Sequence, residues 1–115
     1  MSKRRSDRVS QLMRQIISES IALKWKNKNA HTITVHKVNV ADNIRSIKVF
    51  VSIMGDEEQK ELTMQALQES IGFFKREIGS QVKLRFMPEL KFVYDDTLDY
   101  ADKISKLLSS ISNEK

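Results

Sequence analysis

The sequence lacks cysteine and contains only one proline and three glycines among its 115 residues. Without cysteine, the chain cannot form disulfides, thiolate zinc sites or cysteine nucleophiles. The glycines at positions 55, 72 and 79 match neither a P-loop nor a dinucleotide-binding motif. No apolar run reaches the roughly 18 residues of a membrane span, and the basic residues 1–8 are not followed by the apolar core of a signal peptide. These absences favour a cytoplasmic location.

The length and composition fit one ordinary globular domain. Apolar residues make up 40% of the chain and charged residues 30%, both within the usual range for folded proteins. A chain of this size can bury a hydrophobic core without disulfides or metals. We therefore expect a single domain over residues 1–115, monomeric and without cofactor or metal, in which residues 1–5 and 112–115 are flexible.

Positive charge is concentrated in separate stretches of the chain, and the net charge is +5. Acidic residues gather elsewhere, in stretches 56–61 and 95–102. Separated blocks indicate a surface with one positive side, which attracts polyanions such as nucleic acid. On charge alone, the blocks could equally be solvated faces. The basic clusters are Lys3, Arg4, Arg5 and Arg8; Lys24, Lys26 and Lys28; and Lys75, Arg76, Lys83, Arg85 and Lys91.

Periodicity in the first half predicts a helix followed by a hairpin. Apolar residues from Val9 to Ile21 recur at helical spacing, with Ser6 or Asp7 as the expected cap. Residues 32–40 are rich in β-branched side chains, but the apolar phase changes near His36 and Lys37, which is typical of a β-bulge. Residues 46–53 alternate cleanly. Because a short polar turn joins the two segments, we expect an antiparallel pair.

The second half predicts a broken helix, a strand and a last helix. Asp56 and Gln59 fit a capping box, and a helical period then runs through Leu62, Ala66, Leu67, Ser70, Phe74 and Ile78. Gly72 falls within it and marks either a thin packing contact or a break. Pro88 opens a third strand, and Asp96 caps a helix with the stripe Leu98, Ala101, Ile104, Leu108 and Ile111. The order α-β-β-α(kinked)-β-α predicts an α+β fold with helices on one face of a three-stranded sheet.

Side chains that could support catalysis or metal binding have simpler explanations. Asp95, Asp96 and Asp99 could bind magnesium, but neighbours in extended chain point to opposite faces, and capping or solvent exposure is the favoured interpretation. His31 and His36 would face opposite sides of a strand and make a poor metal pair. We therefore expect no catalytic residue and no enzyme activity. Trp25 lies between lysines and could stack on a base or pack over the first helix, and packing is favoured.

The region around Gly72 carries the most specific expectation from residue chemistry. If the helix breaks there, a new helix begins with free backbone N–H groups near Phe73 and Phe74, which together with the helix dipole attract an anion. Lys75 and Arg76 would lie in the first turn, where cations are unfavourable for the helix itself. A phosphate partner explains their presence better than a plain surface does.

Several segments together resemble the bacterial ribosome-binding factor A family over nearly the whole chain. The resemblance rests on residues 66–73 (ALQESIGF), on 48–52 (KVFVS) followed by Gly55-Asp56-Glu57-Glu58, on residues 84–96 (LRFMPELKFVYDD), and on Arg5-x-x-Arg8-Val9. This family is a type II KH variant in which an Ala-x-Gly interruption between two helices replaces the G-x-x-G loop. Here that place reads Ser70-Ile71-Gly72. The chain also departs from the family at Trp25–Lys28, where Asp-Pro-Arg is common.

The resemblance implies a KH type II-like fold and a role in ribosome assembly. It implies binding to the small (30S) ribosomal subunit and its 16S rRNA, promotion of late maturation and rRNA processing, notably in the cold, and release before translation. A generic KH-type single-stranded nucleic-acid-binding protein and a protein-binding adaptor are the alternatives. The residues expected to contact RNA are Lys3, Arg4, Arg5, Arg8, Lys24, Lys26, Lys28, Ser70, Gly72, Lys75, Arg76, Lys83 and Arg85.

Overall fold

A computed structural model describes residues 3–41 and 43–96, with side chains from Asp7 onward. The elements in chain order are α1 (Lys3–Glu19), the π-helical turn η1 (Ser20–Lys24), the 3₁₀ turn η2 (Ala30–Thr32), β1 (Ile33–Val40), β2 (Ser46–Ile53), α2 (Glu57–Glu69), α3 (Ile71–Gln81) and β3 (Glu89–Tyr94). The predicted order is confirmed through the third strand. The predicted last helix, with Asp96 as its cap, falls in residues 97–115 and lies outside the described part.

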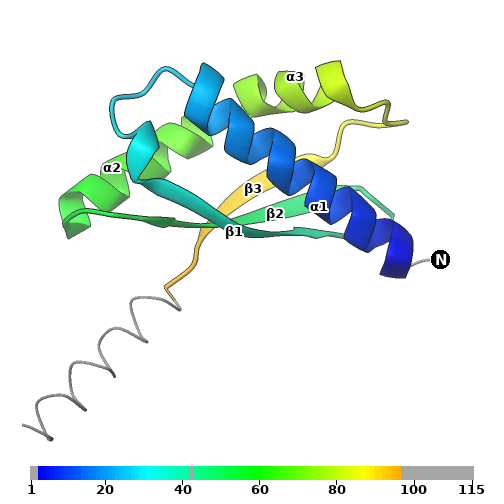
Figure 1. The fold of residues 1–115 in the computed structure, drawn as a ribbon, viewed down its shortest axis with the longest axis horizontal. Coiled ribbons are helices and arrows are strands. Elements are labelled where there is room, and N and C mark those ends of the chain that lie inside the picture. Colours follow the sequence, from blue (N-terminus) through cyan, green and yellow to red (C-terminus); the bar gives the residue numbers. More distant parts are fainter. Residues whose placement is uncertain (1–2, 42, 97–115) are drawn as a thin grey trace, which may run out of the picture.

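The sheet is mixed, with the strand order β1-β2-β3 (Figure 1). β1 pairs with β2 antiparallel, and the register shifts between Val35 and Lys37, so both the predicted hairpin and the predicted bulge are confirmed. β2 pairs with β3 in parallel. Parallel neighbours require a crossover connection, which α2 and α3 supply. This order and this pairing agree with the predicted KH type II-like arrangement.

The three α-helices of the described part cover one face of the sheet, as predicted for them (Figure 1). Apolar side chains of the three strands form a single buried cluster with Met13, Ile16 and Ile17 of α1, Leu67 of α2, and Phe74 and Ile78 of α3. The strand members are Val35, Val38, Ile47, Val49, Val51, Leu90 and Phe92. Because every second residue of β2 from Ile47 to Val51 enters this cluster, the alternation in 46–53 specified which face is buried. Nowhere in residues 3–41 and 43–96 is there a helix long and apolar enough to cross a bilayer.

Helix boundaries and stripes differ from the sequence predictions at several positions. α1 begins at Lys3, so Ser6 and Asp7 lie inside the helix and neither is its cap. Leu12 and Leu62, assigned to the apolar stripes, are 42% and 56% exposed. Thr63 is buried in place of Leu62. A residue at the margin of an apolar stripe can turn outward, and tertiary packing rather than periodicity decides which one does.

The start of α2 follows the sequence prediction in detail. The Asp56 carboxylate accepts a hydrogen bond from the Gln59 N–H (2.8 Å), and the Gln59 side chain accepts one from the Asp56 N–H (3.1 Å), which completes the capping box. Gly55 precedes it with φ +138°, a conformation that side chains rarely adopt. A Cβ at this position would also meet the Gln59 side-chain oxygen. The glycine is therefore required where β2 turns into α2.

We predict that Thr63→Val will stabilise the protein. The Thr63 hydroxyl is buried and has no hydrogen-bond partner among the described residues. Replacing an unsatisfied hydroxyl by a methyl group of similar shape removes its desolvation cost, of about 1 kcal/mol or more. Chemical denaturation should show a higher free energy of unfolding for Thr63→Val and a lower one for Thr63→Ala, which leaves a cavity. A loss of stability in Thr63→Val would mean that the hydroxyl is satisfied.

Candidate nucleic-acid interface

The helix breaks at Ser70, between α2 and α3, as the sequence predicts. Ser70 has φ −98° and ψ 12°, outside the helical region, and its N–H donates to the carbonyls of Ala66 and Leu67 (3.1 Å each). The Phe74 N–H donates to the Ser70 carbonyl at 3.1 Å, which begins the hydrogen-bond ladder of α3. The Phe74 amide is therefore not free, contrary to the prediction, and an anion at this end of α3 would meet amides nearer the break.

Gly72 has no special backbone conformation. It lies in the first turn of α3, is exposed, and does not have positive φ. A Cβ built at this position would have no atom within 4 Å. The glycine therefore neither forces the break nor fills a tight contact. It leaves open space beside the backbone at the start of α3, where a ligand could approach the chain closely.

Lys75 and Arg76 follow in the same helix, and both reach the surface. Lys75 is half-buried and Arg76 is exposed. Across the described ranges, neither side chain takes part in an ion pair. The two positive charges thus lie near the N-terminal end of α3 without a carboxylate to neutralise them. Both would be available to phosphate groups at low cost in lost interactions.

Trp25 packs against the break and does not stack outward. The π-helical turn η1 ends with a hydrogen bond from the Trp25 N–H to the Ser20 carbonyl (2.7 Å). The Trp25 ring lies 5.9 Å from the Phe74 ring, and its Nε1–H donates to the Ser70 hydroxyl at 2.9 Å. Trp25 therefore packs inward, as favoured, but its ring and hydrogen-bond partners are Phe74 of α3 and Ser70 at the break and not the end of the first helix. Ser70 and Trp25 are also two positions at which the chain departs from the family pattern, and here they contact each other.

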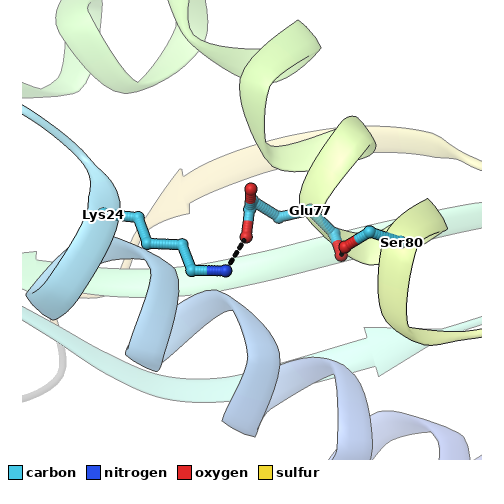
Figure 2. Close-up of polar contacts among 3 residues, drawn as sticks. All are labelled: Lys24, Glu77 and Ser80. Atoms are coloured by element: carbon cyan, nitrogen blue, oxygen red, sulfur yellow. Dashed lines mark hydrogen bonds and ion pairs between the residues drawn. The ribbon is translucent and has the colours of Figure 1, made fainter.

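Lys24 is engaged within the protein. Its ammonium group forms an ion pair with the Glu77 carboxylate of α3 at 2.8 Å (Figure 2). The Lys24 side chain is 55% exposed and that of Glu77 19%. An ion pair this exposed contributes about 1 kcal/mol or less. It nevertheless joins η1 to α3, and RNA would have to compete with Glu77 for this lysine. Lys26 and Lys28 are exposed in the loop that follows.

The predicted site residues form two groups. In the first group, the Trp25–Ser70 hydrogen bond and the Lys24–Glu77 ion pair join the end of η1 to the break. This group consists of Lys24, of Lys26 and Lys28 in the loop that follows η1, and of Ser70, Gly72, Lys75 and Arg76. Toward the other end lie the first turns of α1, with Lys3, Arg4, Arg5 and Arg8, and the segment after α3, with Lys83 and Arg85 (right side of Figure 1). We call the first group the kink group and the second the end group.

Arg45 and Phe86 lie near the end group and were not predicted from the sequence as site residues. The Arg45 guanidinium lies over the exposed Phe86 ring, 5.6 Å from its centroid. Arg45 is an isolated basic residue in a turn, so no charge cluster marks it. Phe86 precedes the third strand and lies next to Arg85, and that adjacency of an aromatic and a basic residue was the available signal.

The described residues contain no group of three or more His, Asp or Glu side chains that could hold a metal ion. His36 of β1 is hydrogen-bonded through Nε2 to the Ser52 hydroxyl (2.7 Å), and His31 is exposed in η2. The Asp95 N–H donates to the Val51 carbonyl at 2.7 Å, which extends the β2–β3 pairing by one residue. Asp99, the third carboxylate of the predicted cluster, lies outside the described part.

The family model for ribosome-binding factor A matches residues 5–108. The chain belongs to the ribosome-binding factor A family. Ribosome-binding factor A of Macrococcus caseolyticus is 36% identical over 111 residues, covering 96% of this chain and 97% of the relative. That of Geobacter sulfurreducens is 37% identical over 111 residues, covering 96% and 94%.

Solved structures of the family share the fold. The crystal structure of ribosome-binding factor A from Thermus thermophilus superposes with a TM-score of 0.67 at 18% identity and covers 77% of this chain and 94% of that one. A Thermus thermophilus homology model fitted into a cryo-electron microscopy map of its complex with the 30S subunit gives 0.62 at 19% identity, covering 75% and 90%. At these identities the likeness concerns the fold.

We predict that Trp25 and Ser70 are energetically coupled. Ser70→Ala removes the acceptor of the indole hydrogen bond, and Trp25→Phe removes the donor while keeping an aromatic ring. A typical hydrogen bond contributes about 1 kcal/mol to stability. A double-mutant cycle on the free energy of unfolding should therefore give a coupling energy of about that size. Fully additive effects would show that the two side chains do not interact in solution.

We further predict that Gly72→Ala will stabilise the fold. Alanine is favoured over glycine in a helix by up to about 1 kcal/mol, and the open space at this position accepts the methyl group. Thermal unfolding should occur at a higher temperature than for the unaltered protein. If the stabilised variant also binds its partner less well, the space beside Gly72 is used by that partner. Destabilisation would contradict the helical backbone at this residue.

Proposed function

We propose that the protein binds the small (30S) ribosomal subunit through its 16S rRNA and promotes late maturation of the subunit, including rRNA processing, notably in the cold. Membership of the ribosome-binding factor A family is the observation that carries this proposal. The 30S complex of the Thermus thermophilus relative supports the choice of the small subunit as partner. The proposal includes a monomeric, single-domain, cytoplasmic protein without a cofactor.

The chemistry of the kink group suits RNA backbone. Lys75 and Arg76 present two charges that no described carboxylate neutralises, and Lys26 and Lys28 add exposed charge in the loop after η1. Contacts between such cations and phosphate are charge-assisted and stronger than neutral hydrogen bonds. The exposed backbone at Gly72 allows close approach. RNA recognition of this kind reads the shape and path of the backbone rather than base sequence.

A binding protein with no catalytic step can still promote RNA folding. If it binds one conformation of the rRNA more tightly than the others, it shifts the population toward that conformation by the difference in affinity. Misfolded RNA escapes more slowly in the cold, so a selective binder contributes more at low temperature. Dissociation then needs only a later state of the subunit that binds less well.

Removing the two charges at the kink should test this function. We predict that the double variant Lys75→Gln/Arg76→Gln will retain its thermal stability, because both side chains reach the surface and surface changes usually cost within about 0.5 kcal/mol. It should bind purified 30S subunits several-fold more weakly in a sedimentation assay. The slope of log affinity against log salt should also fall, by about 0.7 to 0.9 per lost phosphate contact.

Lys48→Gln/Lys91→Gln is the matched control. These two exposed lysines are cross-strand partners on the sheet face opposite the helices, and the substitution changes net charge by the same amount. The control should bind 30S subunits nearly as the unaltered protein does. Equal losses in both variants would indicate a non-specific charge effect. No binding of the unaltered protein to 30S subunits at any salt concentration would refute the proposed function.

A further inference from the structure

A surface hollow lies at the end of the sheet where β2 and β3 begin. Its volume is about 350 Å³, and it is lined by Arg45, Phe86, Met87 and Glu89. This volume is at the lower end of the range of ligand sites, roughly 300 to 1,000 Å³. The Glu89 N–H donates to the Arg45 carbonyl at 2.9 Å, so backbone hydrogen bonding fixes the two sides of the hollow relative to each other.

The apolar side chains of this hollow face solvent. Phe86 is 62% exposed and Met87 44%, although the next residue, Pro88, is fully buried. Single exposed apolar residues are common on protein surfaces and need no explanation. Here, however, two of them are adjacent, and an aromatic ring is held next to a cation. The buried Pro88 fixes the position of this segment, and the backbone path that results leaves the Phe86 side chain on the surface.

One cation lies over the exposed ring, and two more occur in the chain segment that leads to it. The Arg45 guanidinium lies 5.6 Å from the Phe86 centroid, and Lys83 and Arg85 are exposed in the same short segment. Among the described residues, Glu89 is the only acidic residue and Arg45 the only basic residue that line the hollow. Base-stacking sites for single-stranded nucleic acid combine an aromatic ring with a basic surround in this way.

We propose that this hollow binds an unpaired base of single-stranded RNA. The base stacks on the face of the Phe86 ring that the Arg45 guanidinium does not cover, and Arg45, Lys83 and Arg85 contact the flanking phosphates. The inference rests on the proposed function, in that the RNA is taken to be that of the small subunit. It adds a second contact in the end group, away from the kink group, and assigns it to a single-stranded rather than a helical stretch of RNA.

Substitutions at Phe86 separate stacking from simple apolar contact. Phe86→Tyr keeps the ring, Phe86→Leu keeps an apolar side chain without a π face, and Phe86→Ala removes both. The probe is a fluorescently labelled single-stranded RNA of about 12 nucleotides, measured by anisotropy with the full chain, and 30S binding is measured in parallel. We expect Phe86→Tyr to bind normally, and Phe86→Leu and Phe86→Ala to lose roughly ten-fold in affinity for the oligonucleotide.

Met54→Ala is the control for lost apolar surface. Met54 is 75% exposed and follows the end of β2, at the opposite end of the strand from the hollow. Met54→Ala should bind the RNA and the 30S subunits as the unaltered protein does. All variants should unfold at nearly the same temperature, because the Phe86 and Met54 side chains are both exposed.

The possible results separate the inference from the proposed function. Full RNA binding by Phe86→Ala, with normal 30S binding, would overturn the inference alone. The inference would also be overturned if, with 30S subunits only, Phe86→Leu bound fully and Phe86→Ala bound less well. That result would point to an apolar contact with a ribosomal protein. Failure of the unaltered protein to bind 30S subunits would overturn the proposed function, and the inference with it.

Discussion

The packing of Phe74 is the interaction on which the candidate interface depends. Phe74 is fully buried, and its ring centroid lies 5.9 Å from that of Trp25, 5.0 Å from Phe73 and 5.3 Å from Phe92. These partners come from η1's end, α3 and β3. The cluster therefore fixes where α3 starts relative to both the first helix and the sheet. Lys75 and Arg76 directly follow Phe74, so their direction is set by this buried ring and not by their own contacts.

Much of the fold could be predicted because its signals are local. The alternation in residues 46–53, the phase change near His36 and the Asp56–Gln59 capping box each depend on neighbours within a few residues, and each is confirmed. The predicted burial of Leu12 and Leu62 was wrong because it depends on packing between distant elements and not on local sequence. Each lies at the edge of a helical stripe, where a rotation of the helix by a fraction of a turn decides between core and solvent.

The site was only partly predictable, because its decisive contacts join distant parts of the chain. The break at Ser70 is visible from the local sequence, but the hydrogen bond from Trp25 and the ion pair between Lys24 and Glu77 are not. No periodic pattern in the sequence relates the residues that end η1 to α3, which lies about 50 residues later in the chain. Phe86 shows a further limit, since periodicity identifies buried aromatic residues and gives no signal for an exposed one.

The parallel pairing of β2 with β3 has a consequence for how the protein is made. The first helix and the β1–β2 hairpin involve neighbours in sequence and can associate early, whereas Phe92 reaches Val49 only after the whole crossover has been synthesised. Phe92 also completes the aromatic cluster that positions α3. A nascent chain that still lacks its third strand therefore cannot present the kink group in its final form, and the candidate interface is complete only once β3 has been synthesised.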